Sequence, residues 1–304
     1  MPLVLPSAHV GGDVPPSRGR VDALFGIDLR SLAVLRVGLA CYLLVDLTMR
    51  GCDLEAHYTD SGVLPVDVLT RTFRMPWSVH ALSGMWAWQV VLFSLQAVAA
   101  VALAVGWRTR AATVLSWLLL TSLHYRNPVV LNGGDTVIRL LLLWSCFLPL
   151  GAVMSADAKR RRESPESARI LGIPSAALLL QVALIYPLAA VFKLREPVWT
   201  ELRFLTEATS VEGVATALGS WLHGVPPLAA VLTAAALLLE SIGVLFAFSP
   251  WATERLRMFA VVVFIFFHLG IGLVLDLGLF PLAMLVAWAP FVPDRVWNLL
   301  SGSD

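Results

Sequence analysis

Residues 175–192 read SAALLLQVALIYPLAAVF, and this stretch decides the fold class. It is eighteen residues long and carries no charged side chain. A transmembrane helix needs about 20 mostly apolar residues, with a range of roughly 17–25. Pro187 lies inside the stretch and predicts a kink. One helix that crosses a membrane is therefore expected here, followed at once by Lys193.

Other apolar stretches of similar length lie on both sides of it. The spans that we predict are residues 32–49, 85–105, 111–125, 136–153, 175–192, 228–248, 256–275 and 278–291. The third and the eighth are short, so we expect about eight transmembrane helices, with a range of seven to nine. The predicted fold class is all-α, a polytopic integral membrane helical bundle.

The composition supports a lipid environment. The chain has 304 residues, of which 58% are hydrophobic and 14% charged. Soluble domains average about 45–50% apolar and about 25% charged residues. Three cysteines without a CxxC spacing exclude a disulfide scaffold. The formal net charge of +1 gives no field to attract nucleic acid, so the expected partner is the lipid bilayer.

Basic residues predict the orientation. With a cytoplasmic N-terminus, thirteen of the 22 Lys and Arg residues fall on the inner side and six on the outer side. The run AKRRRE at residues 158–163 contributes most to this bias and is interpreted as a topology anchor rather than a lipid-recognition motif. We expect both termini in the cytoplasm of a bacterial plasma membrane. Residues 1–25, rich in Gly, Pro and Ser, are expected to form a flexible tail without a signal peptide, and residues 26–304 one transmembrane domain.

Ionisable side chains within spans are costly and suggest function. The candidates are Arg36, Asp46, Asp135, Arg139, Lys193, Glu240, His268 and Asp276. Asp135 and Arg139 are four residues apart, so they form either a structural pair or part of a site. Arg36 and Asp46 lie about 15 Å apart along one helix, and we expect their partners on other helices. The orientation brings Asp135, Lys193 and His268 towards the outer surface.

Lys193 and His268 each allow two interpretations. Burial disfavours the charged form of a lysine, and a neutral amine is a usable general base. The alternative is a lysine at a helix end that extends its ammonium group to the membrane surface. His268 is either a ligand contact or a hydrogen-bonded contact between helices. No GxGxxG, GxxxxGK[ST], HExxH or GxSxG motif occurs, and the histidines lack metal-ligand spacing, so no metal is expected.

Four stretches resemble a known family. They are FGIDLRSLAVLRVGLACYLLVDLTMRGCDLEAHYTDSGVLP at 25–65, HYRNPVVLNGGDTVIRLLLLWSCFLPL at 124–150, YPLAAVFKLREPVWTE at 186–201 and FFHLGIGLVLDLGLFPLAMLVAWAPF at 266–291. In this order they resemble the horizontally transferred transmembrane (HTTM) domain, the membrane module of the vitamin K-dependent gamma-carboxylase family. Together they cover nearly the whole chain.

The resemblance implies an enzyme of the lyase class with carboxylase and epoxidase chemistry. In the animal carboxylases a lysine deprotonates vitamin K hydroquinone, oxygen adds, and the strong base so formed removes a glutamate γ-proton before CO2 is captured. Lys193 matches that lysine, and His268 matches a histidine of the family. The implied cofactor is reduced vitamin K or a related quinone, with O2 and CO2 as co-substrates. The expected substrate is an exported peptide or protein.

The matched stretches also suggest the other site residues. The carboxylases have a histidine after paired asparagines, where this chain reads NGGD at 132–135, so Asp135 takes the place of that histidine. The expected catalytic residues are Lys193, His268 and Asp135, and the expected cofactor-binding residues are Asn132, Asn127, His124 and Tyr186. The carboxylases' large substrate-binding extracytoplasmic domain has no counterpart in the sequence. The alternative function is a non-catalytic membrane factor, which either assists export and maturation of a secreted peptide or transports a small molecule.

Overall fold

The computed structural model describes residues 16–73, 77–161 and 168–301, and most of this part of the chain is helical. Residues 16–18 are described in their backbone only. In chain order the elements are α1 (Pro16–Phe25), β1 (Ile27–Asp28), α2 (Leu29–Cys52), α3 (Leu54–Tyr58), α4 (Val66–Thr72), η1 (His80–Leu82), α5 (Trp86–Val105), α6 (Thr109–Arg126), η2 (Pro128–Val130), α7 (Gly133–Ser145), α8 (Ala156–Arg160), β2 (Arg169–Ile170), α9 (Ile173–Lys193), α10 (Pro197–Thr200), α11 (Phe204–Ala208), α12 (Ala217–His223), α13 (Pro226–Ile242), η3 (Gly243–Phe248), α14 (Thr253–Val274), α15 (Phe280–Trp288), η4 (Ala289–Phe291) and α16 (Asp294–Ser301).

The predicted helical bundle is confirmed, but the count of about eight transmembrane helices is not. Five helices among the described residues are long and apolar enough to cross a membrane: α2, α5, α9, the α13–η3 segment (Pro226–Phe248) and α14. The segment Phe280–Phe291 is apolar but shorter. Length and composition therefore support an integral membrane protein with fewer full spans than predicted.

Two of the predicted spans are not helices long and apolar enough to cross a membrane, for different reasons. Residues 136–153 do not form one helix, because α7 ends at Ser145 and turns occupy residues 146–154. Pro149 and Gly151 in this segment both disfavour a helix. Residues 111–125 do lie within one helix, α6, but Arg110, His124 and Arg126 at its two ends make it less apolar than the other spans. By contrast, α9 continues through Pro187 to Lys193 as a single helix.

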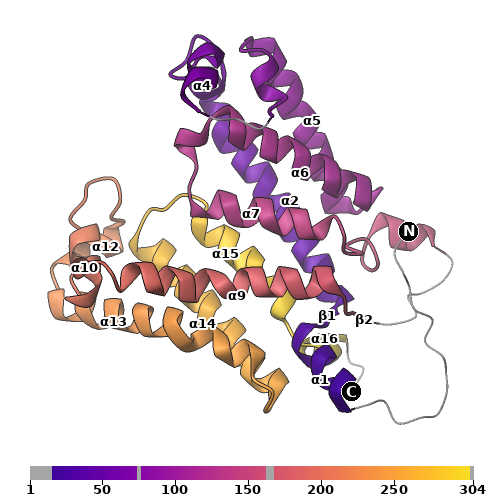
Figure 1. Cartoon of the computed structure of the whole chain (residues 1–304), viewed down its shortest axis with the longest axis vertical. Coiled ribbons are helices and arrows are strands. Elements are labelled where there is room, and N and C mark those ends of the chain that lie inside the picture. The colour runs from indigo at the N-terminus through magenta and orange to yellow at the C-terminus, as the bar shows by residue number, and fades with distance from the viewer. Residues whose placement is uncertain (1–15, 74–76, 162–167, 302–304) are drawn as a thin grey trace.

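The apolar core contains side chains from helices of both the N-terminal and the C-terminal parts of the chain. The helix α2 packs against α5, and α7 and α14 both pack against α15. Figure 1 shows α2 passing behind α7 and α9 lying across α13 and α14. The buried core includes Leu35 and Leu39 from α2, Tyr186 from α9, Phe264 from α14 and Trp288 from α15. Burial of such apolar side chains away from solvent stabilises this packing.

Most of the segments predicted on the inner side lie together. The antiparallel pair β1–β2 joins residues 27–28 to 169–170, and Arg30 bonds Asn298 of α16. The Asp157 carboxylate accepts hydrogen bonds from the N–H groups of Arg108 and Thr109. In Figure 1, α1, β1, β2, α8 and α16 all lie on the right-hand side. Which face of a membrane this side occupies is a prediction from the charge bias alone.

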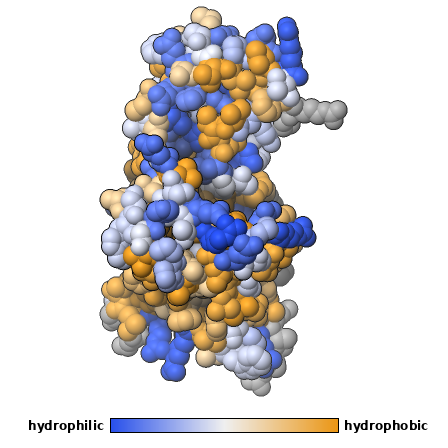
Figure 2. Space-filling model, turned by 90° about the vertical axis from the view of Figure 1, so that its left-hand side faces the viewer, coloured by the Kyte–Doolittle hydropathy of each residue, from blue (hydrophilic) through white to orange (hydrophobic). Residues whose placement is uncertain are grey.

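The opposite side has a mixed surface. In Figure 2, hydrophilic side chains gather across the middle of this face, and hydrophobic side chains cover much of the lower part. The exposed apolar side chains of the molecule include Leu184 and Leu188 of α9 and Phe259 and Phe266 of α14. Exposed apolar surface on the long helices is expected where lipid, rather than water, is the solvent.

The N-terminal prediction needs a correction. Residues 1–25 were expected to be a flexible tail, but Pro16–Phe25 form α1. This helix packs against α9 and α14, and the Leu24 carbonyl accepts a hydrogen bond from Arg257. Residues 1–15 lie outside the described residues, as do Arg74 and Arg162, which the charge count placed on the outer and inner sides.

Candidate functional site

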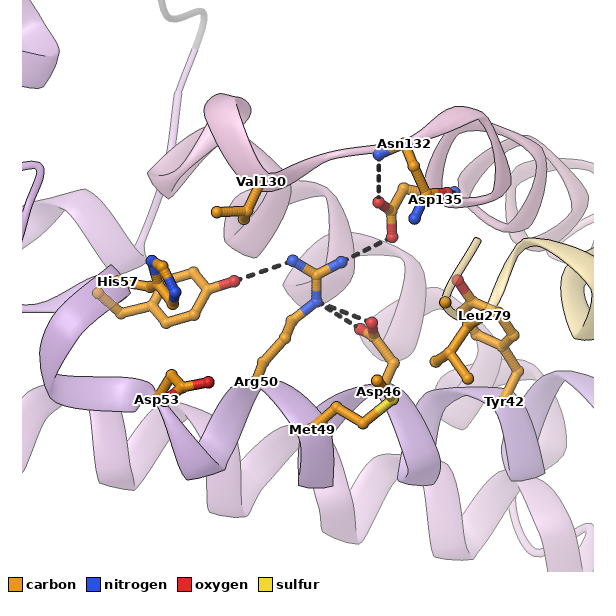
Figure 3. Close-up of a pocket in the computed structure, with 12 residues that line it drawn as sticks. Tyr42, Asp46, Met49, Arg50, Asp53, His57, Val130, Asn132, Asp135 and Leu279 are labelled. Carbon is orange, nitrogen blue, oxygen red and sulfur yellow. Dashed lines mark hydrogen bonds and ion pairs between the residues drawn. The ribbon is translucent and has the colours of Figure 1, made fainter. Parts of the chain in front are cut away.

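The centre of the candidate site is a guanidinium group at the end of α2. Arg50 Nε lies 2.8 and 2.9 Å from the two carboxylate oxygens of Asp46, one helical turn earlier. Arg50 Nη2 donates to Asp135 Oδ1 of α7 at 2.7 Å, and Nη1 donates to the Tyr58 hydroxyl at 2.9 Å. Figure 3 shows these bonds radiating from Arg50. One side chain thus joins three helices.

The local sequence fixes Asp135 in this position. Asn132 precedes α7 and accepts hydrogen bonds from the N–H groups of Gly134 and Asp135, while Asp135 Oδ2 accepts from the Asn132 N–H at 2.8 Å. This reciprocal arrangement is a capping box, in which both side chains satisfy free N–H groups of the first helical turn. It leaves Asp135 Oδ1 directed at Arg50 (Figure 3).

A pocket of about 210 Å³ surrounds this cluster. Asp46, Arg50, Asn132 and Asp135 contribute to its walls. The other lining residues are Tyr42, Met49, Asp53, His57, Tyr58, Val130, Gly278 and Leu279. Burial raises the pKa of Tyr58, although the adjacent Arg50 acts in the opposite direction. Tyr58 is therefore a neutral hydrogen-bond partner of Arg50 at physiological pH.

Lys193 belongs to a second cluster. Its Nζ lies 2.6 and 2.5 Å from the two carboxylate oxygens of Glu240, so the two side chains form an ion pair between α9 and α13. The ammonium group also lies 4.3 Å from the centre of the Trp199 ring, which stacks on Phe204 at 3.8 Å. The isolated neutral amine that the sequence suggested is not what the structure contains, because Glu240 provides a counter-charge.

His268 lies in a buried hydrogen-bonded chain that links α9, α14 and α15. Its Nε2 is 3.0 Å from the Tyr186 hydroxyl, and that hydroxyl accepts a hydrogen bond from Trp288 Nε1 at 2.6 Å. Since an indole N–H can only donate, the Tyr186 proton is directed at His268 Nε2. The His268 Nδ1 atom then carries the ring proton, and it is buried without a hydrogen-bond partner in the described part of the chain.

The structure divides the predicted site residues into two groups. Asp135 and Asn132 line the pocket, and His124 Nε2 lies 3.5 Å from Asp135 Oδ1. Asn127 supports the same region through a 3.0 Å bond to the His57 carbonyl and through the cap of η2. The other group comprises Lys193, Tyr186 and His268.

One of the two alternatives for Asp135 and the expectation for Asp46 are wrong. Asp135 pairs with Arg50 and not with Arg139, whose guanidinium lies over the Tyr125 ring at 5.7 Å. Asp46 was expected to find a partner on another helix, but its partner Arg50 is on the same helix. The expectation for Arg36 is confirmed, since it donates to the carbonyls of Leu103, Ala104 and Met154.

The sequence interpretation missed the roles of Arg50 and Glu240. Arg50 was counted only as an outer topology charge, although its spacing of four from Asp46 indicates a helical ion pair. Glu240 was recognised as a buried ionisable residue without a partner. No spacing rule connects it to Lys193, which is 47 positions away. Among the described residues, no group of three or more His, Cys, Asp and Glu side chains is arranged to hold a metal ion.

Comparison with known proteins identifies the family. The HTTM domain model matches residues 26–297, which is nearly the whole chain. The chain belongs to the HTTM domain family, whose domain occurs in vitamin K-dependent carboxylase-related proteins. Neither the curated proteins nor the solved structures searched contain a match to this chain.

Proposed function

We propose that this protein is a membrane enzyme related to the vitamin K-dependent carboxylases. It acts on a reduced quinone with the Lys193–Glu240 pair as its base, and its substrate is an exported peptide. The observation that best supports the proposal is the ion pair between Lys193 and Glu240. The lysine that matches the family's catalytic lysine is held in contact with a buried carboxylate.

The geometry explains how a charged lysine can act as a base. Both Glu240 oxygens lie within hydrogen-bond distance of Lys193 Nζ, so a proton passes from the ammonium to the carboxylate without any movement of the chain. The Glu240 side chain is only 7% exposed. The amine left behind is then free to accept a proton from a phenolic hydroxyl group.

The surrounding residues fit a reduced quinone in chemical type. Trp199 and Phe204 present stacked flat rings beside the Lys193 ammonium group, and such rings suit a planar aromatic ligand. His268 Nδ1 is a buried donor available to a ligand oxygen. When bound, the quinone would supply the oxygen-dependent chemistry. The pocket around Arg50 does not include Lys193, so we expect the quinone ring to reach Lys193 by displacing side chains.

The decisive experiment uses the full chain in proteoliposomes with reduced menaquinone, oxygen, bicarbonate and a glutamate-containing peptide. We measure conversion of the reduced quinone to its epoxide by mass spectrometry. Removal of a general base typically costs about 10²–10⁴ in rate. Lys193→Ala and Lys193→Arg are both expected to lose activity to this extent, because a guanidinium stays protonated.

Arg195→Ala is the matched control. Arg195 is an exposed cation two positions from Lys193 and has no role in the proposed chemistry. It should retain wild-type conversion. Normal conversion by Lys193→Arg, or none by the wild-type protein in excess of empty liposomes, would exclude this function. That result would favour the non-catalytic factor for peptide export or small-molecule transport.

A further inference from the structure

The pocket around Arg50 has an excess of negative charge. Three carboxylates, those of Asp46, Asp53 and Asp135, line it together with the single guanidinium of Arg50. Asp46 and Asp135 are 4% and 1% exposed, so water compensates little of their charge. A buried charge without a counter-charge is strongly unfavourable. The pocket therefore favours an additional cation.

The Tyr42 hydroxyl in the pocket wall points to a bound ligand, and His124, which contacts Asp135 but does not line the pocket, also lacks a hydrogen-bond partner. Tyr42 is only 1% exposed and lines the pocket, and its hydroxyl makes no hydrogen bond within the described part of the chain. His124 is also 1% exposed, and neither ring nitrogen has a hydrogen-bond partner among the described residues, although Nε2 lies 3.5 Å from Asp135 Oδ1. Buried polar groups in folded proteins are nearly always hydrogen-bonded.

The chemistry of the walls selects the kind of cation. The described residues offer no cluster of metal ligands here, and Arg50 already occupies part of the carboxylate oxygens. Tyr42 and Tyr58 contribute aromatic rings, and Met49 and Leu279 contribute apolar surface. Carboxylates beside aromatic rings suit an organic ammonium group, which they bind through ion pairing and cation–π attraction.

We propose that this pocket binds a primary ammonium group, either of a small free amine or of an ethanolamine lipid headgroup. Asp135 and Asp46 pair with the ammonium, and the Tyr42 hydroxyl accepts one of its hydrogens. Asp53, exposed at the end of α2, attracts the cation to the entrance. The proposal is independent of quinone chemistry, because it concerns binding alone.

The test is equilibrium dialysis of radiolabelled ethanolamine against the full-length protein in detergent, with radiolabelled acetate as the anionic counterpart. We expect saturable binding of ethanolamine and none of acetate. Asp53→Asn should weaken binding by about twofold to fivefold, since an exposed charge pair contributes about 1 kcal/mol or less. The Asp53 side chain makes no hydrogen bond within the described residues, so this variant should fold normally.

Asp135→Asn should weaken binding by at least about tenfold, and Tyr42→Phe by a smaller factor. The control is Asp67→Asn, which removes an exposed carboxylate on α4 outside the pocket and should bind normally. Thermal unfolding of every variant shows whether it is folded. If Asp135→Asn is unfolded, Asp53→Asn and Tyr42→Phe still decide the question.

The two sources of the amine are separated with lipid nanodiscs. Retention of phosphatidylethanolamine over phosphatidylcholine and phosphatidylglycerol, reduced in Asp53→Asn and more strongly in Asp135→Asn, identifies the lipid headgroup. Binding of free ethanolamine without such retention identifies a small amine. Absence of both, binding of acetate in place of ethanolamine, or equal affinity in all variants would overturn the proposal.

Discussion

Arg50 is the residue whose removal should disturb the structure most. It pairs with Asp46 and Asp135 at once, and its own side chain is 11% exposed. Loss of either carboxylate leaves one ion pair intact. Loss of the guanidinium leaves two buried carboxylates without a counter-charge, and breaking such a pair typically costs about 3–5 kcal/mol.

We therefore predict that Arg50→Gln lowers the free energy of unfolding by roughly 3–5 kcal/mol, clearly more than Asp135→Asn does. The measurement is unfolding of the purified variants in one detergent, followed by tryptophan fluorescence. Arg139→Gln is the control, because Arg139 is not bonded to Asp135. A larger loss for Asp135→Asn than for Arg50→Gln would contradict the central role of Arg50.

At this scale the sequence identified the costly ionisable side chains within spans, but it did not predict which of them pair with one another. Asp135 and Arg139 have the spacing of a helical pair, yet the Asn132 cap turns the Asp135 carboxylate towards α2. Lys193 and Glu240 were both recognised as costly charges within spans. Their pairing depends on how α9 and α13 lie against each other, and the spacing along one helix contains no information about that.

At the scale of elements, α6 begins with an unusual cap. The Asp157 carboxylate, from α8, accepts hydrogen bonds from the N–H groups of Arg108 and Thr109 and from the Thr109 hydroxyl. Burial acts to raise the pKa of Asp157, but these hydrogen bonds outweigh it and hold the pKa below its ordinary value. The cap therefore stabilises the folded protein when Asp157 is ionised.

This cap gives a pH-dependent prediction. Asp157→Ala should lower the free energy of unfolding by about 0.5–2 kcal/mol at neutral pH, as is typical for the loss of a helix cap. The wild-type advantage should persist above the unfolded-state pKa of about 3.9 and decline as the pH falls through the lower folded-state value. Thermal unfolding between pH 7 and pH 3 measures it, with Asp67→Ala as the exposed control. An advantage that grows with acidification would show that Asp157 acts in another way.

The predicted elements agree with the structure where apolar length alone decides. The spans at 32–49, 85–105, 175–192, 228–248 and 256–275 all correspond to helices of sufficient length. The prediction of residues 136–153 as a span was wrong because a mean apolar character does not reveal where a helix stops. The Cys146 N–H closes the last turns of α7, and the chain then bends before Pro149.

At the scale of the whole molecule, labelling of the native cysteines can test the predicted orientation of the chain in the membrane. Cys52 is exposed at the end of α2 on the side that we predict to be outer, whereas Cys146 is buried. Cys41 is exposed too, but it lies about 16 Å further along the same transmembrane helix, where lipid is expected to cover it. Maleimides react with the thiolate, which requires contact with water.

We predict that a membrane-impermeant maleimide labels Cys52 in intact cells. Cys52→Ser should abolish the labelling, and Cys41→Ser should leave it unchanged. A reporter fused after Asp304 should be active only in the cytoplasm. Labelling that appears only after the membrane is permeabilised would reverse the orientation inferred from the positive charges.

The small β1–β2 pair has a consequence for biogenesis. Asp28 lies beside Arg169, although roughly 140 residues separate them in the chain. At about 5–20 residues per second, the ribosome supplies the partner strand roughly 7–30 seconds after the first one. The N-terminal end of α2 is therefore synthesised well before the strand β2 that packs beside it. The hydrogen bond from Arg30 to Asn298 forms later still, because α9 to α15 must be made before α16.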